Sequence, residues 1–174
     1  MSSMTKSTPK TLKPDLGLSD ENREGVAELL QVVLADEYVL YTKLHNYHWN
    51  VIGPQFRSLH LLFEEQYNAI HTQVDEIAER IRTYGVYAIG TMSELAGRSR
   101  LSEQPGVYPT AHEMVLEIIA DHEDMVRSLR DDLDKAGSTY GDAGAEDFLT
   151  GLMQAHQEMA WFLRSMIEGD PIHD

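Results

Sequence analysis

Apolar residues recur at helical spacing in four long segments, and this pattern predicts an all-α fold. The first segment runs from Ser19 to about Trp49, and its apolar stripe consists of Val26, Leu29, Leu30, Val33, Leu34, Leu40, Tyr41 and Leu44. The second runs from Arg57 to about Tyr84, with Leu59, Phe63, Tyr67, Ile70, Val74, Ile77 and Ile81 on one face. The third and fourth run from about Thr110 to Ala136 and from about Ala145 to Glu168. The sequence contains no alternating strand pattern of useful length and no internal repeat.

Capping residues and chain breaks separate these segments. Ser19 is a suitable N-cap, Gly53-Pro54 ends the first helix, and glycines at 85, 137 and 169 are placed to end the other three. The connection of about 24 residues between the second and third helices, residues 86–109, has a short helix near Met92–Ala96. So long a crossover suits a four-helix bundle whose second and third helices are not neighbours in an antiparallel pair.

We therefore predict one domain, residues 19–169, between two tails. Residues 1–18 read as a disordered basic tail, and residues 170–174 as a short C-terminal tail.

The chain of 174 residues has no cysteine, which excludes disulfides, thiolate metal sites and cysteine nucleophiles. No apolar run approaches the roughly 18 residues of a membrane helix, and the N-terminus lacks a secretory apolar stretch. We expect a cytoplasmic protein without a membrane segment.

Charge is distributed unevenly along the chain. The net charge is −15, yet residues 1–14 contain only the bases Lys6, Lys10 and Lys13 and no acid. The remaining residues have 11 basic and 29 acidic groups and so a net charge of −18. A body this acidic is expected to repel nucleic acid and to attract cations.

The candidate chemistry lies in His48, His60, Glu64, Asp75 and Glu79. Histidine combined with carboxylate is the ligand set of an iron or zinc site. On a helix that rises about 1.5 Å per residue, His60 and Asp75 lie roughly 22 Å apart. Either the second helix is broken, or His48, His60 and Glu64 form half of a site that Asp75 and Glu79 of another subunit complete.

At about 100° per residue, the four candidates on the second helix fall on one polar stripe beside its apolar face. A solvated charged face is the alternative interpretation, but it leaves the alignment of the histidines and three carboxylates to chance. The Glu-x-x-His motif of self-contained di-iron bundles does not occur in the sequence, which argues against a site within one chain. An antiparallel two-fold pairing of second helices explains the stripe better and supplies two equivalent sites per pair.

The pattern H-W-N-V-x-G-P-x-F-x-x-L-H-x-x-x-E at residues 48–64, followed by D-x-x-A-E-R at residues 75–80, resembles the Dps family of mini-ferritins. The resemblance implies a ferritin-like four-helix bundle that assembles as a hollow homododecamer. It implies oxidation of Fe(II) at ferroxidase sites between subunits, usually with hydrogen peroxide and otherwise with oxygen. It further implies that the ferric mineral is stored inside the shell, which would protect the cell against oxidative damage.

The resemblance also assigns roles to individual residues. His48, His60 and Glu64 match the ligands from one subunit, and Asp75 and Glu79 match those from the other. Many family members have aspartate where this chain has Glu64, so metal distance and affinity are open to change. The site is expected to hold up to two iron ions, with zinc as a substitute.

Other histidines and a tryptophan accompany this ligand set. Trp49 matches a family tryptophan beside the site, where it either takes up a stray oxidising equivalent or only packs. His71 lies on the ligand stripe one turn before Asp75 and is an additional or supporting ligand or an interface histidine. His45 is assigned to the interface. We assign structural roles to the histidines of the later helices, His112, His122 and His156.

In the family, iron enters through acidic pores near the start of the last helix. Asp142, Glu146 and Asp147 occupy that region, and Asp147 aligns best with a pore aspartate. Three copies around an axis would concentrate Fe(II). An ordinary acidic first helical turn is the alternative.

DNA binding is the other property that the family name suggests. Lys6, Lys10 and Lys13, repeated in twelve copies, would contact phosphates, whereas the acidic body opposes binding. We predict weak, salt-sensitive binding at most. The alternative function is a non-enzymatic shell that coats DNA in the nucleoid, with a vestigial or zinc-occupied metal site. A third alternative is a helical interaction module without metal chemistry. It would not explain the spacing of the motif residues.

Overall fold

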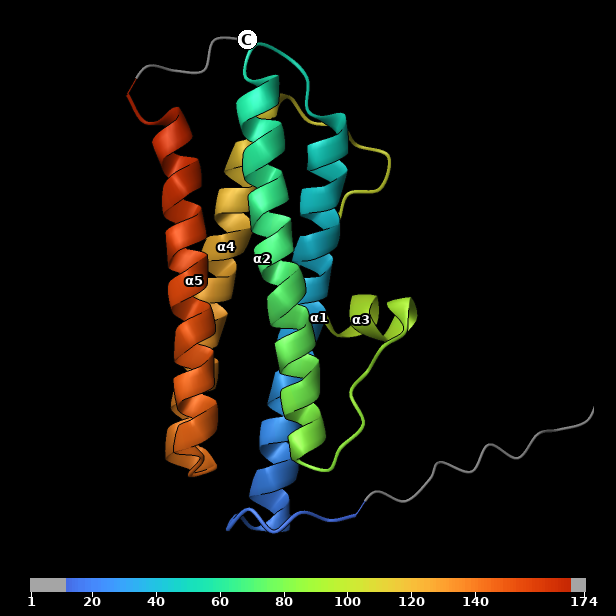
Figure 1. Cartoon of the computed structure of the whole chain (residues 1–174), viewed down its shortest axis with the longest axis vertical. Helices are drawn as coiled ribbons and strands as arrows, with labels where there is room; N and C mark the ends of the chain where they lie inside the picture. The colour runs from blue at the N-terminus through green and yellow to red at the C-terminus, as the bar shows by residue number, and fades with distance from the viewer. Residues whose placement is uncertain (1–11, 170–174) are drawn as a thin grey trace, which may run out of the picture.

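Four long helices and one short helix make up the computed structural model, which describes residues 12–169 (Figure 1). The helices are α1 (Asp20–Asn50), α2 (Phe56–Thr83), α3 (Met92–Arg98), α4 (Ala111–Asp134) and α5 (Ala143–Ile167), with a single π-helical turn, η1 (Lys135–Thr139), after α4. No strand occurs within this range. The predicted all-α bundle with a short helix in its crossover is confirmed. None of these helices has the combination of length and apolar character that crossing a membrane requires.

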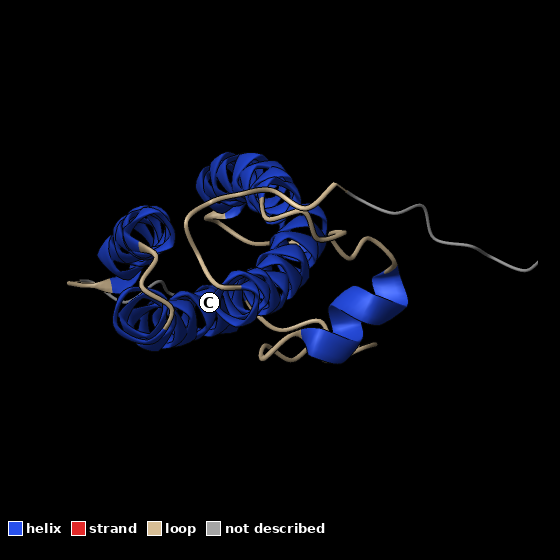
Figure 2. Ribbon diagram, turned by 90° about the horizontal axis from the view of Figure 1, so that it is seen from below, coloured by secondary structure: helices blue, strands red, loops and turns tan. Residues whose placement is uncertain are grey.

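The helices form two antiparallel pairs, α1 with α2 and α4 with α5 (Figure 1). α2 and α4 run in the same direction, so the connection between them must travel the length of the bundle. It does so along the outside of the bundle, where α3 packs on α1. The end-on view shows the four long helices grouped together and α3 set to one side (Figure 2).

The core is formed by aliphatic side chains and a few aromatic ones from all four long helices. α1 contributes most to it, because its buried positions extend around much of its circumference. The largest side chains with almost no solvent contact are Phe63, Leu30, Leu40, Leu44, Leu59, Ile70, Ile77, Ile81, Met114, Ile118, Met125 and Leu129. Burying a side chain of this size contributes about 1.5–3 kcal/mol.

Buried polar side chains of α1 hold the crossover in place. Asp36, which has no exposed surface, accepts hydrogen bonds from the Ser99 hydroxyl at 3.0 Å and from the backbone N–H and Nε of Arg100, both at 2.6 Å. The guanidinium of Arg100 also bonds Asp132 of α4 at 2.8 Å. Gln31 accepts from the N–H of Ile89 at 2.9 Å. The crossover is thus fixed by specific bonds and not only by its length.

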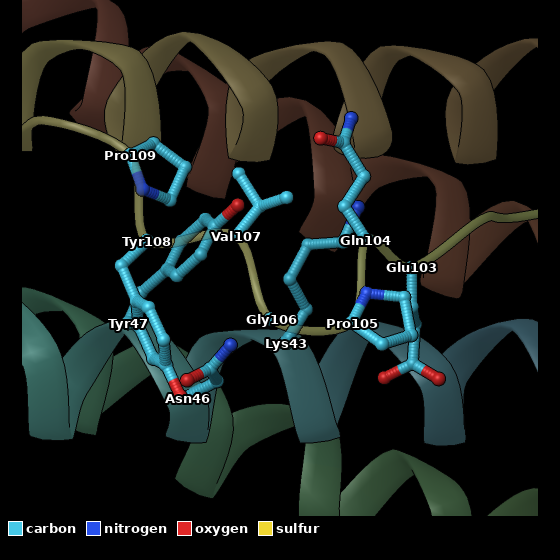
Figure 3. Close-up of a pocket in the computed structure, with 10 residues that line it drawn as sticks. All are labelled: Lys43, Asn46, Tyr47, Glu103, Gln104, Pro105, Gly106, Val107, Tyr108 and Pro109. Carbon is cyan, nitrogen blue, oxygen red and sulfur yellow. The ribbon is translucent and has the colours of Figure 1, made fainter.

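Beyond α3, residues 103–109 of the crossover lie over α1 and enclose a pocket of about 170 Å³ (Figure 3). Three polar side chains of α1 line it, Lys43, Asn46 and Tyr47, and acids of α4 bond two of them. The Lys43 ammonium bonds Asp121 at 2.6 Å, and the Tyr47 hydroxyl donates to Glu117. Burial, reinforced by this carboxylate, raises the pKa of Tyr47. These bonds tie α1 to α4 across the bundle.

The predicted end of the third helix at Gly137 is wrong. Helical structure continues through η1, and the chain turns at Gly141, whose φ of 67° favours glycine. Gly137 is needed for a different reason, since a Cβ there would lie 2.3 Å from Oε2 of Glu146. The predicted helix ends at Gly85 and Gly169 are confirmed, because these glycines have φ values of 74° and 97°, which do not continue a right-handed helix.

The described part of the predicted N-terminal tail, residues 12–18, contacts the bundle. Lys13 forms an ion pair with Asp20 at 2.7 Å. Pro14 lies so close to Gly85 that a Cβ on this glycine would be 2.6 Å from its Cδ. Lys6, Lys10 and the predicted tail 170–174 lie outside the described residues.

Gly25 provides a test of how α1 packs on the end of α4. A Cβ at Gly25 would lie 2.4 Å from Cε1 of Tyr140, so Gly25→Ala must displace this ring. We expect it to lower the free energy of unfolding by about 1–3 kcal/mol, measured by denaturant titration.

Gly151→Ala is the matched control, because a Cβ there meets nothing within 4 Å among the described residues. This helical substitution should raise stability by about 0.5–1 kcal/mol. Equal effects of the two substitutions would contradict the packing of Tyr140 on Gly25.

Candidate metal centre

His48 and His60 face each other across the turn between α1 and α2. Each ring bonds the backbone of the other residue, with His48 Nδ1 2.8 Å from the carbonyl oxygen of His60 and His60 Nδ1 2.8 Å from that of His48. A carbonyl oxygen only accepts, so both Nδ1 atoms have a hydrogen. In the neutral rings the two Nε2 atoms therefore keep their lone pairs, the form in which histidine binds a metal.

The local sequence explains how this pair forms. Gly53 adopts a φ of 112°, which lets α2 begin only a few residues after α1 ends. The two imidazoles then stack with centroids 3.7 Å apart and planes 18° apart. The carbonyl of His48 lies in the last turn of α1, where backbone acceptors lack helical donors, so the His60 ring also caps the helix.

Neighbouring side chains support the pair and connect it to Glu64. Phe56 stacks on His60 with centroids 5.0 Å apart, and Tyr67 meets His48 edge-on at 5.3 Å. The Tyr67 hydroxyl donates to Oε1 of Glu64 at 3.4 Å. Burial, and then the Glu64 carboxylate, raise the pKa of Tyr67, so the phenol stays a donor at neutral pH. Glu64 lies one helical turn after His60 on the same side of α2.

Asp75 and Glu79 are not brought to these residues within one chain. α2 is unbroken from Phe56 to Thr83, so Asp75 lies roughly 22 Å further along it than His60. This excludes the alternative of a broken helix. Both carboxylates are exposed. Within residues 12–169 of a single chain, no three His, Asp or Glu side chains are arranged to hold a metal ion.

Trp49 and His71 lie at the two ends of a row of aromatic rings on α1 and α2. Trp49, which is 68% exposed, contacts His45 at 5.1 Å, and His45 stacks on Tyr67 at 3.8 Å. Tyr41 joins His45, at 4.6 Å, to His71, at 5.6 Å. Burial, followed by the charges of His48 and His71, lowers the pKa of His45. In this row, His71 contacts the ring of Tyr41.

The three acidic residues predicted to line a pore differ in their surroundings. Asp142 is the N-cap of α5: its Oδ1 accepts from the N–H of Ala145 at 3.0 Å, and its Oδ2 accepts from the hydroxyl of Tyr84 at 2.5 Å. Burial and this carboxylate raise the pKa of Tyr84 to about 12. Glu146 and Asp147 are exposed. Asp142 therefore has a structural role that its sequence position did not reveal.

A second pair of histidines was not predicted from the sequence. His122 and His156, to which no partner could be assigned, lie opposite each other in the core, and both are fully buried. Their positions on the apolar faces of α4 and α5 were visible in the sequence, but their contact depends on how these helices pack.

This arrangement, a four-helix bundle with histidines at the α1–α2 turn and carboxylates along α2, defines a class of protein. A family model described as a ferritin-like domain matches residues 27–171, so the chain is a ferritin-like protein. Within this class it belongs to the Dps family. The chain is 40% identical over 142 residues to DNA protection during starvation protein 2 of Bacillus anthracis, covering 82% of this chain and 96% of that protein.

Two further comparisons extend the match. A low temperature-induced protein of Nostoc sp. is 51% identical over 158 residues, which is 91% of this chain and 88% of the relative. The X-ray structure of Dps from Thermosynechococcus elongatus superposes with a TM-score of 0.81 at 32% identity. That match covers 88% of this chain and 98% of the other.

The role of Asp142 can be separated from that of Asp147 by measuring stability. Asp142→Ala removes the cap of α5 and leaves the buried Tyr84 hydroxyl without its acceptor, so we expect a loss of about 1–3 kcal/mol. Asp147→Ala, at an exposed position in the same helix, should change stability by less than about 0.5 kcal/mol. Denaturant unfolding of both variants checks this. An unchanged stability of Asp142→Ala would contradict the capping role.

Proposed function

We propose that this protein is an iron-storing ferroxidase. It takes up Fe(II), oxidises it at sites shared between two subunits and keeps the ferric product as mineral inside a hollow shell of twelve subunits. In this way it removes the iron that would otherwise generate oxidative damage. The main support is the reciprocal bonding of His48 and His60 to each other's backbone, which engages both Nδ1 atoms and, in the neutral rings, leaves both Nε2 lone pairs available to a metal ion.

The donor set suits both oxidation states of the substrate. The imidazoles of His48 and His60 bind Fe(II) without adding charge, and the carboxylates of Glu64, Asp75 and Glu79 favour the harder Fe(III) ion. Oxidation therefore increases the attraction between the metal and its ligands. The same donors accept zinc, which cannot be oxidised and would act as a competitor.

A site for two substrate ions explains how oxidation avoids radicals. Each of two Fe(II) ions gives up one electron, and one hydrogen peroxide molecule accepts both. Its O–O bond breaks, two protons are taken up, and two water molecules leave. Transfer of a single electron would instead release a hydroxyl radical. Oxygen is the alternative oxidant.

The unbroken length of α2 supports a site made by two chains. Pairing of two α2 helices around a two-fold axis would bring Asp75 and Glu79 of one subunit to the histidine pair of the other. Each pair then contains two equivalent sites, and six pairs make the dodecamer. On this proposal a single subunit is inactive, since it has only half of each ligand set.

A mixing experiment tests whether the two halves of the ligand set come from different subunits. The variants His48→Ala/His60→Ala and Asp75→Asn/Glu79→Gln should each fail to oxidise Fe(II), followed by ferric absorbance after addition of peroxide. In shells assembled from equal amounts of both, half of the pairs are mixed, and each mixed pair has one complete site. About one quarter of the wild-type activity should therefore return.

The assembled state of each variant, measured by light scattering, is the control for this experiment. Mixed shells that form but stay inactive would place both halves of the site in the same subunit. Wild-type rates in the His48→Ala/His60→Ala variant alone would refute the ferroxidase function.

Iron entry is proposed to occur through acidic pores near the start of α5. Asp147 is exposed there, and three copies around a three-fold axis would raise the local concentration of Fe(II). Asp147→Asn should slow iron uptake at low Fe(II) and leave the rate at saturating Fe(II) unchanged, because the oxidation site is intact. Equal uptake by wild type and variant at low Fe(II) would contradict the pore role.

A DNA-coating shell is the alternative function, and the name of the Bacillus anthracis relative favours it. Against it, Lys13 is paired with Asp20, which reduces the charge available for phosphates, and the body of the protein is strongly acidic. Weak binding at low salt is the most that we propose.

A further inference from the structure

A chain of hydrogen bonds crosses the core of the bundle and involves all four long helices. Oε1 of Glu37, on α1, lies 2.9 Å from Nε2 of His156, on α5. Nδ1 of His156 lies 2.8 Å from Nδ1 of His122, on α4. Nε2 of His122 lies 3.3 Å from Oε1 of Gln66, on α2. Glu37, His122 and His156 have no exposed surface, and Gln66 is 3% exposed.

The hydrogens in this network can be assigned from its neutral end. Nε2 of Gln66 donates to the carbonyl of Met159 at 3.0 Å, so its Oε1 is an acceptor. Nε2 of His122 must then have the hydrogen. Complete burial holds the pKa of His122 well below its usual value, so the ring is neutral and its Nδ1 is an acceptor.

The assignment then passes to the other side of the network. Because Nδ1 of His122 accepts, Nδ1 of His156 must donate. Nε2 of His156 is either a second N–H facing a Glu37 carboxylate, or an acceptor facing a protonated Glu37. In both arrangements His122, His156 and Glu37 together carry one proton more than they would if both histidines were neutral and the glutamate were ionised.

The second oxygen of Glu37 decides between these arrangements. Its Oε2 is buried and has no hydrogen-bond partner among the described residues. An ionised carboxylate would leave a charged oxygen unsolvated, which is much more costly than an unpaired oxygen of a neutral acid. We propose that Glu37 is a neutral carboxylic acid in the folded protein and donates its proton to His156.

Charged groups around the network do not alter this balance. Three elements contribute one titratable group each, Glu37, His122 and His156, whereas Gln66 from α2 does not titrate. The acids next to them in sequence are paired with bases outside the network, as Asp36–Arg100, Asp121–Lys43 and Glu123–Arg164. Glu37 therefore forms a buried proton-binding site that none of the proposed iron chemistry requires.

The proton makes folding dependent on pH in a way that can be isolated. At a pH well above about 4.3, the ordinary pKa of glutamate, this residue is ionised in the unfolded chain, so folding takes up one proton. The contribution of this site to stability is therefore lost as pH rises, until the folded network releases its proton. In Glu37→Gln the amide N–H replaces the acid as donor to His156, and no proton needs to be taken up.

The experiment compares the unfolding equilibria of wild type and Glu37→Gln between pH 6 and pH 8 at a fixed protein concentration. The ratio of their folding constants, wild type to variant, should fall about tenfold per pH unit. Glu21→Gln, an exposed position on the same helix, is the control and should give a constant ratio. A constant ratio for Glu37→Gln as well would overturn the proposal.

Neutron diffraction on crystals of the wild-type protein tests the same assignment without a variant. We expect hydrogen or deuterium on Oε1 of Glu37 and on Nδ1 of His156, with Nε2 of His156 bare. A hydrogen on that Nε2 atom would mean an ionised Glu37 and would overturn the proposal. This result would hold even if Glu37→Gln did not fold.

Discussion

The position of α1 among the other helices is the constraint on which the rest of the structure depends. Because α1 is buried around much of its circumference, its polar side chains lose water on folding, and an unpaired one would cost about 1–3 kcal/mol. Several buried polar side chains of α1 accordingly bond groups on other elements. Asp36 bonds Arg100 of the crossover, Glu37 bonds His156 of α5, and His48 bonds the start of α2. These bonds fix the register of three neighbours against a single helix.

The geometry of α2 determines what the site can do. A metal ion holds its ligands at about 2 Å, whereas His60 and Asp75 are separated by roughly 22 Å of continuous helix. On the proposed function, His60 and Asp75 can therefore share a metal ion only when two copies of this helix lie side by side. On the proposed function, oxidation of iron is tied to assembly, and a free subunit cannot oxidise Fe(II) outside the shell.

Much of this was predictable from the sequence, for local reasons. The spacing of His48 and His60 around Gly53-Pro54 brings the rings together through a short turn, and helical periodicity places Glu64 beside them. Contacts between distant segments were not predictable. Whether His122 meets His156 depends on the rotation of α4 against α5, and the bond that Asp142 accepts from Tyr84 joins residues far apart in the sequence. Gly137 was misread because a glycine that permits close packing looks like one that ends a helix.

The two histidine pairs show how neighbours determine the chemistry of one side chain. His48 and His60 each use Nδ1 on a backbone carbonyl, so both Nε2 atoms are left to bind a metal ion. His122 and His156 use Nδ1 on each other, and their Nε2 atoms are engaged by Gln66 and Glu37. Binding a metal there would require breaking buried hydrogen bonds, at a cost that an open pair does not have. On the proposed function, iron therefore binds at the first pair, and the second retains a proton.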